Sequence, residues 1–170
     1  NKHLVPIYIY EYESFKKLKT LKTCQGLVAR VLFSPNDKYL AAASSDRNVY
    51  LFNVEADYEL LYIMRGNSSS VTDLMFSADS WVLISNSADA QVLYFEVPTG
   101  ARIANAVKLR DTEWDTWEAR FGWPVMGIWQ NKNDVTDVNT VCQSHDGKLL
   151  ALGSDDGHVE LFRYPNAPDC

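Results

Sequence analysis

The chain of 170 residues has little of what membrane, disulfide-rich or nucleic-acid-binding proteins require. It has no run of about 18 apolar residues, which a membrane-spanning helix would need, so we expect no membrane partner. Its 3 cysteines, Cys24, Cys142 and Cys170, are widely spaced without a C-x-x-C pair, which disfavours a disulfide framework and favours a reducing cytoplasm. The net charge of −6 disfavours nucleic acid, because Lys and Arg on phosphates dominate that binding.

The sequence also lacks a constellation for catalysis or for a cofactor. It has only 8 glycines and no glycine-rich phosphate loop, and its histidines belong to no cluster with metal-ligand spacing. Ser144-His145-Asp146 contains the residue types of a hydrolytic triad, but three adjacent residues cannot place His between Ser and Asp. We therefore predict a protein that is not an enzyme and that uses no cofactor and no metal.

What the sequence does contain is one short motif in three copies. Each copy has a serine, an aspartate two positions later and a phenylalanine six positions after that: Ser44, Asp46 and Phe52; Ser87, Asp89 and Phe95; Ser154, Asp156 and Phe162. The step from Asp46 to Asp89 is 43 residues and the step from Asp89 to Asp156 is 67, so 24 extra residues precede the third copy. A period in the low forties, built from short strands, is typical of a repeated four-stranded blade.

The three aspartates fall in the tight turn before each third strand, where a carboxylate can accept backbone N–H groups. A role as metal ligands or acids is the alternative, and their recurrence in every copy favours the structural interpretation. The three phenylalanines end the third strands at a position suited to packing between blades. Asp46, Asp89, Asp156, Phe52, Phe95 and Phe162 are therefore predicted to be structural.

The apolar runs between the turns predict an all-β protein of WD-repeat-like propeller blades. We expect about three and a half four-stranded antiparallel blades, a fragment of a larger propeller, since a complete one has about 4–8 blades. The expected segments are the outer strands of a truncated preceding blade in 1–24, a blade in 25–67, a blade in 68–109, an insertion in 110–137 and a partial last blade in 138–170. The fourth strand of the second full blade is expected over Ala101–Val107. Open blade edges would allow self-association.

This pattern resembles the WD-repeat family in a degenerate form. Phe52-Asn53, Phe95-Glu96 and Phe162-Arg163 stand where a Trp-Asp pair usually ends the repeat, and the opening Gly-His is missing. The resemblance implies a β-propeller that serves as an interaction platform rather than as a catalyst.

The insertion makes the chain similar to a narrower group, the echinoderm microtubule-associated protein-like family, over residues 25–165. The similarity is carried by Arg110-Asp-Thr-Glu-Trp114-Asp-Thr-Trp117, Phe121-Gly-Trp123-Pro-Val-Met-Gly-Ile-Trp129 and Asp134-Val-Thr-Asp137-Val-Asn139. It implies the second of two tandem propellers and a cytoplasmic scaffold of the cytoskeleton with tubulin, microtubules and cytoskeletal proteins as partners. The alternative is a generic WD-repeat adaptor whose microtubule binding resides in regions absent from this chain.

Two groups of residues are candidates for binding a partner. Trp114, Trp117, Trp123 and Trp129 lie in the insertion, and tryptophan is enriched at interaction hot spots. The alternative, which we favour, is that these rings pack the insertion onto the blades. The turn Gly122-Trp-Pro124 and Gly127 suggest a bent hairpin there.

The second group is the basic cluster Lys16, Lys17, Lys19 and Lys22, which offers a salt-sensitive contact to the acidic surface of assembled tubulin. Against this, lysines along an edge strand are a common protection from aggregation, and we favour that interpretation.

Overall fold

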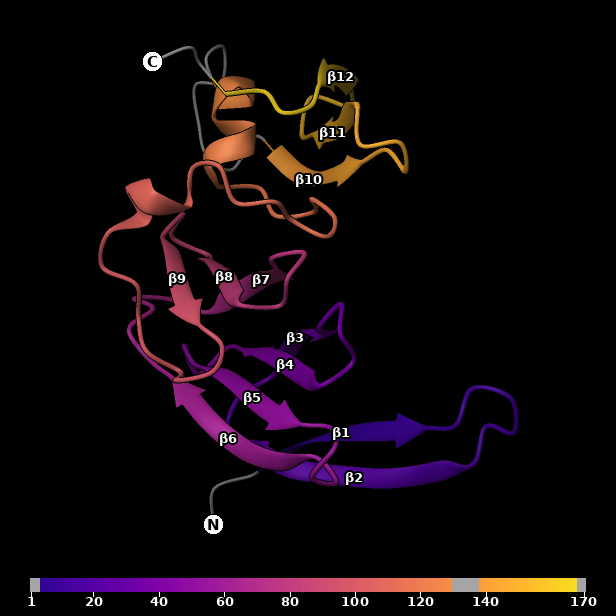
Figure 1. Ribbon diagram of the computed structural model, residues 1–170. Helices are drawn as coiled ribbons and strands as arrows, with labels where there is room; N and C mark the ends of the chain where they lie inside the picture. Colours follow the sequence, from indigo (N-terminus) through magenta and orange to yellow (C-terminus); the bar gives the residue numbers. More distant parts are fainter. Residues whose placement is uncertain (1–3, 130–137, 168–170) are drawn as a thin grey trace.

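The computed structural model describes residues 4–129 and 138–167. Within these residues, four antiparallel sheets follow one another around an open arc (Figure 1). The first two sheets consist of β1 (Val5–Tyr10) and β2 (Lys17–Cys24), then β3 (Val28–Phe33), β4 (Tyr39–Ser44), β5 (Val49–Asn53) and β6 (Glu59–Met64). The last two consist of β7 (Val71–Phe76), β8 (Val82–Ser87) and β9 (Val92–Glu96), then β10 (Val138–Gln143), β11 (Leu149–Ser154) and β12 (Val159–Arg163). Within each sheet, every strand pairs with the strand next to it in sequence, as expected for propeller blades.

The repeated motif forms the tight turns β4–β5, β8–β9 and β11–β12. The residue after each aspartate has a positive φ: 72° at Arg47, 63° at Ala90 and 79° at Gly157. Its backbone N–H donates to the carbonyl of the motif serine, at 3.2 Å from Arg47 to Ser44 and 3.0 Å from Ala90 to Ser87. This left-handed conformation favours glycine, but only the third copy has one there.

The core consists of apolar clusters that lie between neighbouring sheets. Leu21 and Phe52 belong to the cluster between the first two sheets, and Leu51 and Phe95 belong to the next one. In β4 the residues from Leu40 to Ser44 are all buried, so this strand is covered on both faces. Stacked sheets bury apolar surface in this way without a separate covering layer.

Two expectations about local structure were wrong. No strand forms over Ala101–Val107: a single bridge joins Phe95 to Arg102, and the short 3₁₀ helix η1 (Ala106–Leu109) follows. The chain leaves the sheet because the Asn105 side chain accepts the Val107 backbone N–H at 3.2 Å and caps this helix. The β7–β9 sheet therefore has three strands, as has the β10–β12 sheet, and only β3–β6 has four among the described residues.

The bent hairpin expected in the insertion was also wrong. The 3₁₀ helix η2 (Trp123–Trp129) occupies this stretch, and its Val125 backbone N–H donates to the Gly122 carbonyl at 3.2 Å. The stretch 130–137, with Asp134 and Asp137, lies outside the described residues.

No helix in the described part of the chain is long and apolar enough to span a membrane. The thiols of Cys24, which is buried, and Cys142, which is exposed, are free, and Cys170 lies outside the described residues.

Candidate functional site

The first repeat turn holds Asp46 in hydrogen bonds that reach the start of its own sheet. Its carboxylate accepts the Tyr50 hydroxyl at 2.6 Å and the backbone N–H groups of Gln25 and Asn48, each at 3.1 Å. Burial alone would raise the pKa of Asp46, but these bonds and one with Ser44 hold it below its ordinary value. Asp46 thus connects the β4–β5 turn to the segment before β3.

The second and third turns have comparable bonds with different partners. Asp89 accepts the Ser87 hydroxyl and the Ser68 hydroxyl, both at 2.5 Å, and Ser68 precedes β7. Asp156 accepts the hydroxyl of Ser154 and the His158 backbone N–H, and these bonds lower the pKa of Asp156 to about 2. The interpretation of these aspartates as structural requires partners of this kind. For Asp46 and Asp89 they include a residue at the start of the sheet, whereas those of Asp156 lie within the turn.

The motif phenylalanines lie between sheets. Phe52 and Phe95 are buried, each in a cluster shared by two neighbouring sheets, and Phe162 is partly buried against the cluster that contains the insertion.

Neither a metal centre nor a catalytic triad is assembled in the described residues. They include no group of three His, Cys, Asp or Glu residues that could hold a metal ion. Ser144, His145 and Asp146 form the β10–β11 turn, where the Ser144 hydroxyl donates to Asp146 at 2.6 Å. Asp146 also accepts the Lys148 backbone N–H at 3.1 Å, as expected for a turn aspartate.

The insertion runs between the β7–β9 sheet and the β10–β12 sheet (Figure 1). The Ala78 backbone N–H donates to the Glu113 carbonyl and the Gln143 backbone N–H to the Trp117 carbonyl, both at 2.9 Å. Trp117 is fully buried, and its ring packs edge-on against Trp114 at 5.4 Å between centroids. Trp117 is therefore removed from the candidate partner-binding residues, because a side chain with no exposed surface cannot anchor a partner on this fold.

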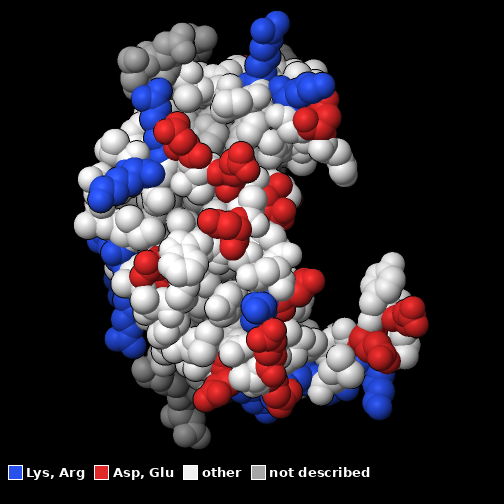
Figure 2. Space-filling view, viewed as in Figure 1, with Lys and Arg blue, Asp and Glu red and all other residues white. Residues whose placement is uncertain are grey.

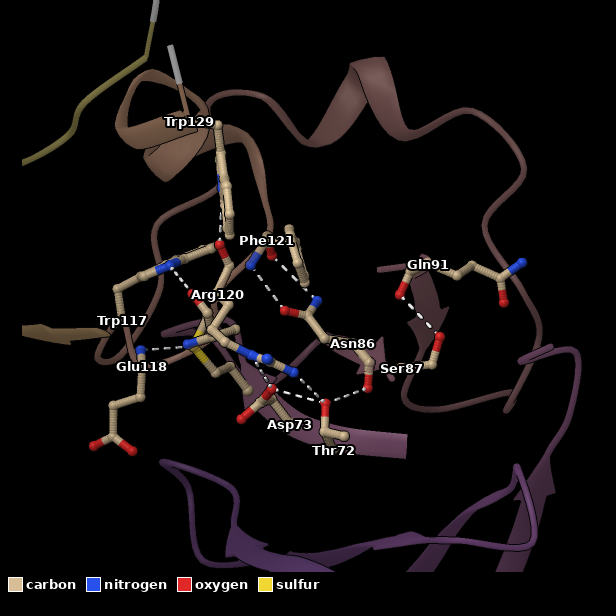
Figure 3. A network of polar contacts seen from close by, with 12 residues as sticks. Thr72, Asp73, Asn86, Ser87, Gln91, Trp117, Glu118, Arg120, Phe121 and Trp129 are labelled. Carbon is tan, nitrogen blue, oxygen red and sulfur yellow. Dashed lines mark hydrogen bonds and ion pairs between the residues drawn. The ribbon is translucent and has the colours of Figure 1, made fainter. Parts of the chain in front are cut away.

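Polar side chains of β7 hold the insertion in place (Figure 3). Arg120 donates from Nη2 to Thr72 Oγ1 at 3.2 Å, and its Nε lies 3.5 Å from Asp73 Oδ2. The Thr72 hydroxyl donates to Asp73 at 2.9 Å, so the three side chains form one partly buried group. The sulfur of Met75 accepts the Glu118 backbone N–H at 3.1 Å.

Asn86 on β8 makes the most specific contact to the insertion (Figure 3). Its side chain accepts the Phe121 backbone N–H at 2.9 Å and donates to the Phe121 carbonyl at 3.1 Å. The Phe121 ring stacks on Trp129 with 4.8 Å between centroids, and Trp129 Nε1 donates to the Arg120 carbonyl at 3.2 Å. One buried amide therefore fixes the position of an aromatic pair.

The other candidate tryptophans are partly buried and border hollows at the surface. Trp123 Nε1 donates to the Ala106 carbonyl at 3.1 Å, whereas Trp114 Nε1 is buried without a hydrogen-bond partner among the described residues. Trp123 and Trp129 line a hollow of about 370 Å³ together with Met126, whose side chain is exposed. These two tryptophans, unlike Trp117, can touch a partner.

The four candidate lysines do not form one surface. Irregular pairing puts Lys17 opposite Tyr10 but Lys19 opposite Ile9, so Lys17 and Lys19 lie on different faces of the β1–β2 hairpin. Lys19 is ion-paired with Asp57 in the turn between β5 and β6.

On the other face, Lys17 lies 5.6 Å from the ring centroid of Tyr8. Lys16 and Lys22 are exposed. The outer face of the hairpin therefore offers Lys17 and Lys22 beside tyrosines, with Lys16 at its tip.

Neither Asn86 nor Arg120 was predicted to have a role from the sequence, and neither was the ion pair between Arg30 and Glu118. For Asn86 a signal existed, since an amide inside an apolar strand must find hydrogen-bond partners when buried. For Arg30 and Glu118 there was none, because they are 88 positions apart.

Comparisons with known proteins give one consistent result. The sequence model of the echinoderm microtubule-associated protein second beta-propeller matches residues 6–169. The 77 kDa echinoderm microtubule-associated protein of Lytechinus variegatus is 42% identical over 146 residues, which cover 82% of this chain and 22% of the relative. Echinoderm microtubule-associated protein-like 2 of Homo sapiens is 40% identical over 141 residues, 81% of this chain and 22% of that protein. The chain spans about a fifth of the length of these relatives.

Among solved structures, the computationally designed Ika4 protein superimposes with a TM-score of 0.56 at 16% identity. The match covers 93% of this chain and 79% of that one. At this identity the match shows a likeness of fold alone.

Proposed function

The chain belongs to the echinoderm microtubule-associated protein family, and we propose on that premise that it is a non-catalytic interaction scaffold that associates with microtubules or tubulin. The observation that carries this proposal is the match of residues 6–169 to the second propeller of a family whose members are named for microtubules. The cytoskeleton in the cytoplasm is the location that the proposal implies. An open arc of sheets with solvent-exposed turns suits a surface that binds other proteins.

The outer face of the β1–β2 hairpin is the contact that we propose for the acidic microtubule surface. Lys16, Lys17 and Lys22 are exposed there, and the tyrosines beside them add apolar contact area. Lys19 is excluded from this set because it is ion-paired with Asp57. Exposed charges are screened over about 8–10 Å near physiological salt, so the association should weaken as salt rises.

Co-sedimentation of the folded chain with assembled microtubules, across a salt series, tests the proposal. We expect saturable pelleting that declines with salt, and loss of most of it when Lys16, Lys17 and Lys22 are all changed to Glu. The matched control reverses the charge of three exposed residues outside the hairpin and has the same change in net charge: Arg47→Glu, Lys148→Glu and Arg163→Glu. Equal pelleting of the two variants would exclude the hairpin contact.

The rival function is a generic adaptor whose microtubule binding lies in regions outside this chain. A folded, monodisperse sample that does not pellet with microtubules at any salt concentration would favour it and would contradict the proposal.

Self-association must be measured in the same samples, because aggregates also pellet. The last sheet exposes Val159 and Leu161, at 76% and 68% of their surface, and the first sheet exposes Tyr8 and Tyr10. We propose that such open faces pair chains at high concentration. Sedimentation velocity over a hundredfold concentration range would show this as a rising sedimentation coefficient, and a constant value would contradict it.

A further inference from the structure

The hollow of about 370 Å³ lies between β9, η1 and η2, and its walls are almost entirely apolar. The rings of Tyr94, Phe121, Trp123 and Trp129 and the side chain of Met126 form most of its surface. Its volume is at the low end of the roughly 300–1,000 Å³ range of ligand pockets. It can accept one large apolar side chain and part of a backbone.

A second hollow of about 220 Å³ adjoins the first. Trp123 and Met126 line both, and the second ends at Arg110, Asp111 and Pro165. The two hollows adjoin at these shared side chains, and we call them together the η2 groove. Met126 is 44% exposed between them, and an unbranched thioether adapts easily to different ligands.

The connection that runs beside the η2 groove is basic. Residues 97–110 contain Arg102, Lys108 and Arg110 but no Asp or Glu. All three cations are exposed, and no ion pair joins any of them to another described residue.

Charge is distributed unevenly over the molecule. Figure 2 shows Lys and Arg gathered along the edge where Figure 1 places the connection 97–110, whereas Asp and Glu gather nearer the opening of the arc. Asp111 is the one carboxylate among the residues that line the groove. In a chain of net charge −6, this basic edge selects for an acidic partner.

We propose that the η2 groove binds an extended acidic peptide segment, with one bulky apolar side chain in the larger hollow and carboxylates against Lys108 and Arg110. The site goes beyond the proposed association with microtubules and does not depend on it.

Charge complementarity distinguishes this occupant from two others. In a symmetric contact with a second copy, the basic edges would face each other. An anionic membrane would meet a chain whose overall charge is also negative.

The probe is a fluorescein-labelled synthetic peptide of six glutamates around one phenylalanine, titrated with the folded chain and followed by fluorescence anisotropy. We expect saturable binding that weakens about tenfold when the phenylalanine of the peptide becomes alanine. We expect a loss of tenfold or more for the protein variant Lys108→Glu, Arg110→Glu, and a similar loss for Met126→Asp. All three positions are exposed, so their substitution should leave the thermal unfolding midpoint unchanged within about 2 °C.

The matched control is Arg47→Glu, Lys148→Glu, which changes the net charge equally at exposed positions in the β4–β5 and β10–β11 turns. The proposal is overturned if this control weakens binding as much as the groove variant, or if the alanine peptide binds as well as the phenylalanine peptide. It is also overturned if phosphatidylserine vesicles bind more tightly than the peptide with the same dependence on Lys108 and Arg110. A dimer that Met126→Asp abolishes would assign the groove to a second copy instead.

Discussion

Replacing Asn86 by alanine tests how the insertion is held on the β7–β9 sheet. The Asn86 side chain is fully buried and makes two hydrogen bonds to the backbone of Phe121, at 2.9 and 3.1 Å. Alanine removes both partners at once and leaves the Phe121 N–H and carbonyl without them.

The magnitude follows from the position of these groups. A neutral hydrogen bond contributes about 1 kcal/mol net, and a buried group left without a partner costs about 1–3 kcal/mol. Because the Phe121 backbone is only partly buried, water can replace some of the hydrogen bonding that Asn86 provided. We therefore expect Asn86→Ala to lower the unfolding free energy by about 2–3 kcal/mol, or Tm by roughly 4–12 °C for a domain of this size.

Urea unfolding followed by circular dichroism and by tryptophan fluorescence measures this loss. The control Asn105→Ala removes an exposed side-chain hydrogen bond, the one that caps η1, and should cost about 1 kcal/mol or less. Equal and small effects of the two substitutions would refute the reasoning, since the insertion would then be held without the Asn86 amide.

Two further predictions concern the insertion and the repeat turns. Gly122→Ala should destabilise the fold by about 2–4 kcal/mol in the same assay, because Gly122 has φ +157° and an added Cβ would lie 2.4 Å from the Trp117 ring. Acid should also destabilise the fold, because the folded pKa of Asp46 lies below its ordinary value. The contribution of Asp46 to the unfolding free energy is present above its ordinary pKa of about 4 and is lost as pH falls through the folded pKa. The urea midpoint should therefore fall between pH 5 and pH 3, and less so in Asp46→Asn.

Each of these has a direct control. Gly157→Ala places Cβ in open space at φ +79°, so it should cost only about 1 kcal/mol, and an equal loss at Gly122 would contradict the proposed steric clash. For the acid effect, the difference between the chain and Asp46→Asn is decisive. Parallel midpoints at every pH would show that Asp46 does not contribute.

The strands could be predicted from the sequence because local patterns determine them. The apolar runs Val28–Phe33, Glu59–Met64 and Val71–Phe76 are strands β3, β6 and β7 in the structure. Each is an apolar run between turn residues, and pairing with the next strand requires no distant information. The fourth strand expected over Ala101–Val107 failed because Asn105 caps a 3₁₀ helix, a local alternative with similar sequence requirements.

The position of the insertion could be predicted from the sequence, but its conformation could not. Its aromatic residues have no sustained period that would separate helix from strand. The turn residues suggested a bent hairpin, and the 3₁₀ structure that forms instead has no strong sequence signal. Nor could sequence distinguish the buried Trp117 from the partly exposed Trp123, because the difference arises from contacts with β10 and η1. The lysines show the same limit: irregular pairing at Lys17 decides which of them share a face.

The position of the insertion links stability to recognition. Trp117 is packed between two sheets. Trp123 and Trp129 pack against the same buried apolar cluster and also line the η2 groove. Substituting any of these rings would change the groove through the fold as well as through lost contacts, so reduced binding alone would not identify a contact residue. Exposed positions beside the groove, such as Lys108 and Met126, can change recognition while leaving the packing intact. Partner binding by this insertion is therefore best assigned from such variants, with unfolding free energies measured alongside.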